Sequence, residues 1–207
     1  KNNEVKALVA TSALGMGFDK PDLGFVVHLG APSSPVAYYQ QVGRAGRGTP
    51  SADVLLLPGA EDKDIWEYFA TSSMPAEGPA TAVLSELAAG AVMSTGALET
   101  RVNLKRSPLE LLLKVLAVDG AVERVAGGWR GTGEPWSYDR ERYERISAAR
   151  VREQQAMLDY ESTTGCRMEF LSVQLDDPAA APCGRCDNCA GRWFSSEVAE
   201  EATDSAG

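Results

Sequence analysis

All four cysteines of this 207-residue chain fall in one short segment near its end. Cys166 is followed, after an interval, by three cysteines at every third position: Cys183, Cys186 and Cys189. Four thiolates at such spacing suit a tetrahedral Zn²⁺ site, which would tie the segment into one small module. Two disulfides are the alternative, but no secretory signal is visible and a reducing compartment favours the metal. We therefore expect a structural zinc ion in a cytoplasmic protein.

A second feature is the run from Tyr39 to Gly48, which contains two arginines separated by small residues. If the run is helical, Arg44 and Arg47 share one face. A guanidinium offers a planar fork of donors that suits the oxygens of a phosphate, and the amide of Gln40 precedes the pair. The run is therefore suited to grip a polyphosphate. An exposed basic turn is the alternative, because short Gly/Arg runs are common in loops.

The stretch 10–20, followed by 40–47, resembles motifs V and VI of superfamily 2 helicases, in the right order and at the right separation. The resemblance makes Arg47 an arginine finger, with Arg44 and Gln40 as its companions at the nucleotide. Such an arginine offsets the charge that develops on a transferred phosphoryl group. The resemblance also implies a set of ATP-contacting residues: Gly17, Asp19, Arg44 and Arg47. Gln41 departs from the pattern, because RecQ-type sequences usually have Glu at this position.

Residues 1–72 alternate short apolar runs with helical patterns, which predicts a partial RecA-like domain with a parallel α/β sheet. We expect buried strands over 5–10, 25–28 and 52–57, and helices over 33–41 and 62–69. Thr11 and Ser12 follow the first strand, at the sheet edge where ligands gather. Motif V implies that they hold a DNA phosphate, with a strand-end cap as the alternative. His28, the only histidine, is expected to be a strand residue and not a catalyst.

Residues 79–135 predict a winged-helix-like α+β unit, after a linker over 71–79. The expected helices cover 80–91, 95–102 and 107–118, the last one capped by Ser107 with Glu110 completing a capping box. A two-stranded wing should follow over 121–132. The third helix is too apolar for base recognition, so a packing role is favoured.

The wing carries the candidate DNA contacts of this unit: Arg124, Trp129 and Arg130. They would contact the DNA backbone or separate the strands. Ordinary hairpin packing is the alternative for the aromatic side chain.

Residues 136–194 predict a helical zinc-binding module that begins with a charge-rich helix over 138–160. The run from Tyr160 through Cys166 to the Cys-x-x-Cys-x-x-Cys motif resembles the zinc module of RecQ-family DNA helicases. A winged-helix-like unit before the cysteines is unusual for RecQ proteins and resembles the divergent RecQ-like helicases of mycobacteria and their relatives. The family unwinds DNA in the 3′-to-5′ direction with ATP, which implies single-stranded DNA, or a duplex with a 3′ tail, as partner.

The sequence lacks a Gly-x-x-x-x-Gly-Lys-Ser/Thr loop and an acidic pair for Mg²⁺. ATP and Mg²⁺ would therefore be bound mainly by an N-terminal RecA-like domain of the same protein, and this fragment alone should be inactive. A net charge of −9 argues against wholesale nonspecific nucleic-acid binding. No apolar run approaches the ~20 residues of a membrane span, and residues 195–207 form an acidic tail expected to be disordered.

Two functions from different classes remain open. In the first, the chain is the C-terminal part of an ATP-dependent DNA helicase. In the second, it is a zinc/winged-helix module that binds DNA or protein, and its RecA-like remnant is not catalytic. The paired arginines favour the first, because a scaffold has no need of a phosphate-gripping loop.

Overall fold

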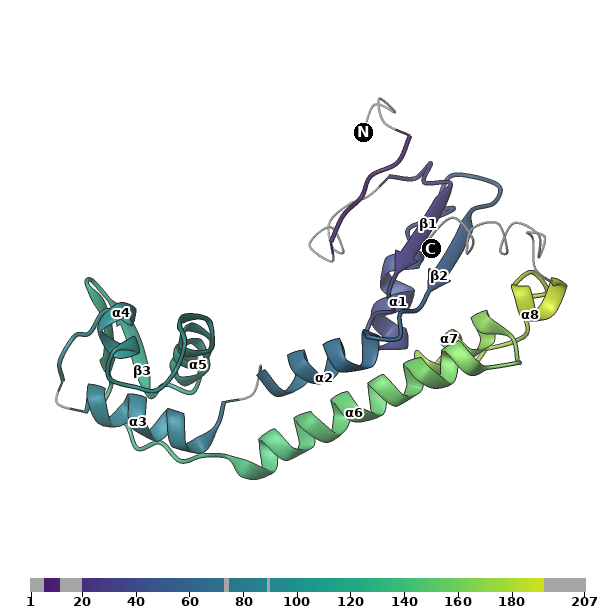
Figure 1. Ribbon diagram of the computed structural model, residues 1–207. Coiled ribbons are helices and arrows are strands. Elements are labelled where there is room, and N and C mark those ends of the chain that lie inside the picture. Colours follow the sequence, from purple (N-terminus) through teal and green to yellow (C-terminus); the bar gives the residue numbers. More distant parts are fainter. Residues whose placement is uncertain (1–5, 12–19, 73–74, 89, 192–207) are drawn as a thin grey trace. The chain divides into compact units, whose positions relative to one another are not determined.

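The computed structural model describes residues 6–11, 20–72, 75–88 and 90–191 (Figure 1). The chain divides into two compact units, one formed by residues 1–63 and 151–207 and the other by residues 64–150. The elements are β1 (Phe25–Leu29), α1 (Pro35–Val42), β2 (Asp53–Leu57), α2 (Asp62–Ser72), α3 (Glu77–Leu87), α4 (Thr95–Glu99), α5 (Arg106–Val118), β3 (Val122–Val125), β4 (Gly128–Gly131), α6 (Arg140–Ser162), α7 (Arg167–Gln174) and α8 (Asp187–Ala190). The four-part domain division expected from the sequence stays a prediction.

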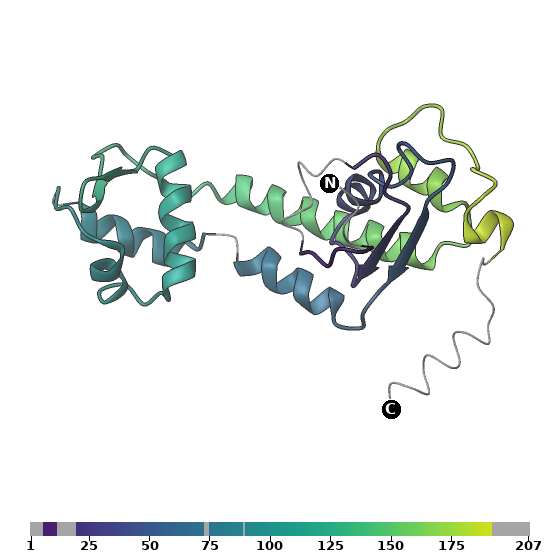
Figure 2. The ribbon, with the colours of Figure 1, turned by 90° about the horizontal axis from the view of Figure 1, so that it is seen from above.

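The first unit contains a parallel pair of strands, β1 and β2, which are joined through α1 (Figures 1 and 2). The hydroxyl of Ser34 caps α1 by accepting from the backbone N–H of Ala37, and proline occupies the first helical position. The buried carboxylate of Asp62 accepts from the N–H groups of Ala31 and Gly59, at 2.6 and 2.8 Å. These bonds tie the loop after β1 to the loop after β2. The predicted parallel α/β arrangement is confirmed.

Two expectations about this sheet are wrong. The described residues of the predicted first strand, 6–10, form no strand, and Leu8 and Val9 are 60% and 97% exposed. β1 also leaves Phe25 and Val27 about half exposed, although a fully buried strand was expected. An apolar run becomes a buried parallel strand only where other elements cover both of its faces. Among the described residues, such cover is incomplete on β1 and lacking over Leu8 and Val9.

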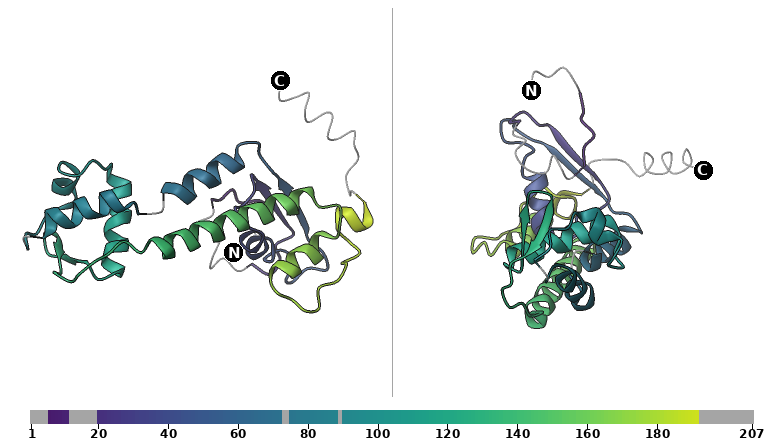
Figure 3. Two further views of the ribbon diagram at one scale, coloured as in Figure 1. Left: turned by 90° about the horizontal axis from the view of Figure 1, so that it is seen from below. Right: turned by 90° about the vertical axis from the view of Figure 1, so that its left-hand side faces the viewer.

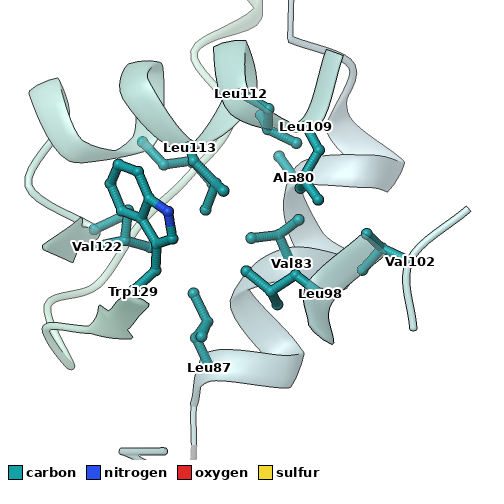
Figure 4. Close-up of a cluster of buried hydrophobic side chains, with 12 residues drawn as sticks. Ala80, Val83, Leu87, Leu98, Val102, Leu109, Leu112, Leu113, Val122 and Trp129 are labelled. Atoms are coloured by element: carbon teal, nitrogen blue, oxygen red, sulfur yellow. The ribbon is translucent and has the colours of Figure 1, made fainter. Parts of the chain in front are cut away.

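The second unit packs α3, α4 and α5 against the antiparallel hairpin of β3 and β4 (Figure 4). The core consists of small and aliphatic side chains from these elements together with one indole: Ala80, Val83, Leu87, Leu98, Val102, Leu109, Leu112, Leu113, Leu116, Ala121, Val122 and Trp129. Met93 pairs with Trp129 in an isolated antiparallel bridge, and a Cβ at Gly128 would collide with the Met93 carbonyl. The predicted order of three helices and a hairpin is confirmed.

The predicted start of α5 is wrong. The helix begins at Arg106 and Lys105 is its N-cap, so Ser107 lies inside the first turn. Glu110 does not complete a capping box but accepts from Nε of Arg106 at 2.8 Å. Pro108 is tolerated there because the first N–H groups of a helix have no intrahelical acceptor.

The other helix boundaries differ by a few residues. α2 continues to Ser72 and α3 begins at Glu77, so the connection is shorter than the predicted linker. α3 ends at Leu87 and α4 at Glu99, short of the ends expected for them. α6 covers 140–162 and matches its prediction within two residues (Figure 3). No helix in the described ranges is both long enough and apolar enough to cross a bilayer.

Candidate zinc centre and arginine turn

The four cysteine side chains meet in one compact cluster. Their Sγ atoms all lie within 4.8 Å of one another, and those of Cys166 and Cys186 are 3.9 Å apart. None of the four forms a disulfide. Zn–S bonds of about 2.3 Å in a tetrahedron would place neighbouring sulfurs roughly 3.8 Å apart. The cluster therefore has the dimensions and the donor set of a four-thiolate zinc site.

Backbone N–H groups prepare two of these sulfurs for metal binding. Sγ of Cys166 accepts from the N–H groups of Glu169 and Cys183, at 3.5 and 3.1 Å, and Sγ of Cys186 accepts from that of Arg167 at 3.4 Å. Burial alone would raise the pKa of Cys166, but the N–H donors of Glu169 and Cys183, together with hydrogen bonds to the side chains of Cys183 and Cys189, outweigh it and lower that pKa to about 6. The thiolate is the form that binds a metal.

Two further contacts hold the short helix α8 against the loop between α6 and α7. Arg167 forms a fork with the carboxylate of Asp187, at 3.0 Å from Nε and 3.1 Å from Nη2, and this pair lowers the pKa of Asp187. The amide of Asn188 donates to the carbonyls of Thr163 and Gly165, at 2.8 and 2.7 Å. The cysteine cluster thus lies in a loop system whose polar groups are paired with one another.

The two arginines of the predicted phosphate grip lie in a turn and not on a helix face. α1 ends at Val42 with Gly43 as its C-cap. Each Nε donates to the carbonyl four residues earlier, Arg44 to Gln40 at 3.2 Å and Arg47 to Gly43 at 3.1 Å. These bonds satisfy carbonyls at the end of α1, where positive charge is favourable. Residues 43–48 are called the arginine turn below.

The glycines of the arginine turn attach it to the segment that precedes β1. The N–H of Gly46 donates to the carbonyl of Leu23 at 3.0 Å, and that of Gly48 to Pro21 at 2.6 Å. Gly46 has φ +76°, which favours glycine, and a Cβ at Gly48 would approach Pro21 within 3.0 Å. The turn is therefore bonded to residues that follow closely after Asp19 in the sequence.

Some candidate residues lie outside the described ranges, and one described candidate, Thr11, has a role that the structure does not test. The expected contacts at Ser12, Gly17 and Asp19 are outside the described residues. Thr11 is exposed. Its predicted contact with a DNA phosphate stays a prediction.

The three wing residues occupy different environments. Trp129 is 6% exposed and its indole N–H donates to the hydroxyl of Thr95 at 3.2 Å. Arg124 lies over the Trp129 ring, with its guanidinium carbon 5.5 Å from the ring centroid, and Arg130 pairs with Glu123 at 2.6 Å. The contacts of Trp129 are those of the packing alternative, and a base contact would require the indole to leave the core. The DNA role of the three stays a prediction.

Sequence reasoning missed the residues that connect the cysteine cluster to α1 and the arginine turn. Arg167, Tyr160 and Tyr38 were not proposed as site residues. A signal was available for Arg167, because an arginine directly follows the first cysteine of the motif. The signal for the two tyrosines is only their long-range packing, which no local pattern reveals.

Two family models match separate parts of the chain. Residues 1–49 match the helicase conserved C-terminal domain, and residues 137–190 match the RecQ zinc-binding family. The chain therefore contains one segment similar to the helicase conserved C-terminal domain and one similar to the RecQ zinc-binding family. The four-cysteine cluster lies in the zinc-binding match, and together they support zinc as the bound metal. The first match includes the whole arginine turn, residues 43–48.

The similar proteins are named as helicases. The ATP-dependent DNA helicase RecQ of Synechocystis is 31% identical over 199 residues, which is 90% of this chain and 39% of that protein. The ATP-dependent DNA helicase RecQ of Bacillus subtilis is 44% identical over 61 residues, 30% of this chain and 10% of that protein. The mouse ATP-dependent DNA helicase Q1 is 50% identical over 60 residues, 29% of this chain and 9% of that protein. The chain thus spans well under half the length of each of these relatives.

Proposed function

We propose that the chain is the C-terminal part of an ATP-dependent 3′-to-5′ DNA helicase of RecQ type, with the domain order of the divergent mycobacterial group. The observation that carries this proposal is the arginine turn. Two guanidinium groups lie in a glycine-rich turn, within a segment similar to the helicase C-terminal domain, and each is oriented by a bond from Nε. The protein would act in the cytoplasm, in association with the nucleoid.

In this proposal Arg47 is the arginine finger, and Arg44 and Gln40 assist it at the nucleotide. An N-terminal RecA-like domain of the same protein binds ATP and Mg²⁺, and this chain brings the arginines to the γ-phosphate. A guanidinium at that position stabilises charge that shifts during phosphoryl transfer, so it acts mainly on the transition state. Gly17 and Asp19 complete the nucleotide contacts from this chain.

The four cysteines hold a structural zinc ion in this proposal. Cys166, Cys183, Cys186 and Cys189 would bind Zn²⁺ as thiolates, and all four positions of the tetrahedron would be filled by protein. A closed site of this kind supplies folding energy and leaves no position for a reacting water.

DNA is the proposed polynucleotide partner. Thr11 and Ser12 would hold its backbone, and Arg124 and Arg130 of the wing would add exposed positive charge. Contacts of this type are made to phosphates, so the affinity of the fragment should be weak, independent of sequence and sensitive to salt.

The test of the finger is Arg47→Ala in the intact helicase. Its rate of ATP hydrolysis should fall by roughly 10³-fold or more, while DNA binding without nucleotide changes little. Arg47→Lys should not restore the rate, because an ammonium lacks the planar fork. The matched control is Arg101→Ala, which removes an exposed arginine paired with Glu86 on the second unit. Hydrolysis at the wild-type rate by Arg47→Ala would show that the finger is wrongly assigned, and Arg44 would be tested next.

The second candidate function is a zinc/winged-helix binding module with a non-catalytic RecA-like remnant. The observation in its favour is the self-contained core of the second unit. Binding of the 207-residue chain to duplexes of unrelated sequence, measured over a range of salt, separates the two functions. Tight binding to one sequence that persists in high salt would support the module and contradict the helicase assignment.

A further inference from the structure

A continuous series of contacts joins the cysteine cluster to the helix that carries the arginine turn. α7, which begins after Cys166, packs against α1. The series runs within the first unit from Cys186 and Asp187 through Arg167 and Tyr160 to Tyr38 on α1. Each step is a direct contact between neighbouring groups.

Arg167 is the branch point of this series. Its backbone N–H donates to Sγ of Cys186, and its side chain forms the fork with Asp187. Its remaining guanidinium nitrogen, Nη1, donates to the carbonyls of Tyr160 and Glu161 at 2.7 and 3.3 Å, near the end of α6. One side chain therefore binds the metal-site loop and a helix end, and the negative end of the helix dipole favours its charge.

Tyr160 continues the series from Arg167 to α1. The guanidinium of Arg167 lies over its ring at 5.5 Å, and the ring of Tyr38 packs against it with centroids 5.3 Å apart at 49°. Both tyrosines are almost fully buried, at 6% and 3% exposure, so their rings cannot shift independently. Tyr38 lies in α1, less than two turns before Arg44.

The far end of the series depends on the cysteines. α8 has four residues, and none of them is buried. Its described contacts to the rest of the unit come from the cysteine cluster, the Arg167–Asp187 fork and Asn188. A helix so short has no stability of its own. The placement of Asp187 against Arg167 therefore depends on the sulfurs being held together.

We propose that Arg167 and Tyr160 are positioning residues that transmit the metal-bound arrangement of the cysteines to the arginine turn. This inference rests on the proposed function, because it assigns the zinc site a role in orienting Arg44 and Arg47 for phosphoryl transfer. With the metal bound, α8 holds Asp187 against Arg167, Arg167 fixes Tyr160, and Tyr160 fixes Tyr38 and the end of α1. Without this series α1 keeps its cap at Ser34 and the contact of Tyr38 with His28, but loses the contact of Tyr38 with Tyr160.

Hydrogen exchange in the zinc-loaded 207-residue chain tests the series directly. Asp187→Asn weakens the fork and keeps all four cysteines, and Tyr160→Leu removes the aromatic link away from the metal. Both should retain one zinc per chain and should speed amide exchange at Gly46 and Gly48 by about tenfold, because these N–H groups are bonded to the neighbouring segment only while the turn is fixed. Tyr160→Phe keeps the ring and should exchange like the wild type.

The matched control is Asp119→Asn, which weakens a comparable pair with Arg142, 2.9 Å long, in the second unit. It should leave exchange of the arginine turn unchanged. Wild-type exchange at Gly46 and Gly48 in both Asp187→Asn and Tyr160→Leu, with zinc retained, would overturn the inference.

Kinetics of the intact helicase separate this inference from the proposed function. Tyr160→Leu should lower kcat for ATP hydrolysis about tenfold, with little change in KM, and Tyr160→Phe should recover most of it. If Arg47→Ala hydrolyses ATP normally, the finger assignment fails, whereas the coupling is still judged by exchange. If Arg47→Ala is inactive and Tyr160→Leu has wild-type exchange and kcat, only the coupling fails.

Discussion

The cysteine region and the second unit reach a fixed structure by different means. In residues 77–132 a continuous cluster of buried apolar side chains joins three helices and a hairpin. In residues 160–191 the buried side chains are few, namely Tyr160, Cys166 and Leu171. The cysteine region instead relies on sulfur contacts, the Arg167–Asp187 fork and the amide of Asn188.

This difference determines which perturbation each region tolerates. Burial of a large aliphatic side chain contributes about 1.5–3 kcal/mol, so a cluster of such residues stabilises a small unit without help. A loop system with little buried area cannot offset the loss of chain entropy in this way and needs a staple such as a metal. The same chain should thus contain one region that depends on zinc and another that depends on packing.

Removal of the metal should have the largest effect. Structural zinc contributes an apparent ~10–16 kcal/mol in small zinc peptides, so Cys186→Ser or chelation should unfold the cysteine region. Elemental analysis should give one zinc per wild-type chain and much less in Cys186→Ser. Amides of residues 163–191 should lose protection from exchange, while those of α5 keep theirs. Well-folded wild-type protein without zinc would contradict the zinc dependence of the cysteine region. Loss of protection in α5 on metal removal would show that the second unit depends on zinc as well.

Truncation of the packed core should have the next largest effect. Leu113 is fully buried on α5, and Leu113→Ala should lower the free energy of unfolding of the second unit by about 2–5 kcal/mol. Leu111 lies on the same helix but is 37% exposed, so Leu111→Ala is the matched control and should cost under about 1 kcal/mol. Denaturant titration followed by hydrogen exchange of the α5 amides measures both. Loss of zinc from Leu113→Ala would show that the two regions do not fold independently.

The parts that the sequence predicted correctly have a local or strongly spaced signal. Cysteines at every third position indicated the cluster, the run of leucines indicated the buried face of α5, and Gly127–Gly128 indicated the hairpin turn. The helix expected over 33–41 is likewise present as α1, Pro35–Val42. In each case a few neighbouring residues determine the outcome, so no distant contact is needed.

The parts that were missed depend on distant contacts. The start of α5 is the exception, because it is decided locally: Ser107 has the residue type of a cap, yet the helix starts earlier and Arg106 engages Glu110 one turn away. The burial of the strand at 6–10 depends on which elements cover it, which the run of apolar residues does not reveal. Arg167 and Tyr160 matter through partners about 20 and 122 positions away, Asp187 and Tyr38, a separation at which sequence patterns carry no information.

The smallest predicted effect concerns an unfavourable charge close to the cysteine region. Oε1 of Glu161 is buried and has no hydrogen-bond partner among the described residues. Burial raises the pKa of this carboxyl, and the carboxylate of Asp62 raises it further. The native state therefore binds more protons than the unfolded chain between the ordinary pKa and the raised one. Stability contributed by the protonated form is present at low pH and is lost as pH rises through the folded pKa.

Glu161→Gln should remove the loss of stability that accompanies deprotonation of Glu161, while keeping the shape of the side chain. The gain in the free energy of unfolding should appear at pH 7, should shrink toward zero near pH 4, and should stay under about 1 kcal/mol because solvent screens a carboxyl group that is only partly buried. Unfolding of the variant and the wild type at matched pH measures the difference directly. Glu153→Gln, at an exposed position of α6, is the control and should show no such trend. An equal gain at both pH values would mean that the loss arises from packing and not from charge. The cysteine region would then share the energetic basis of the second unit more closely than its few buried side chains indicate.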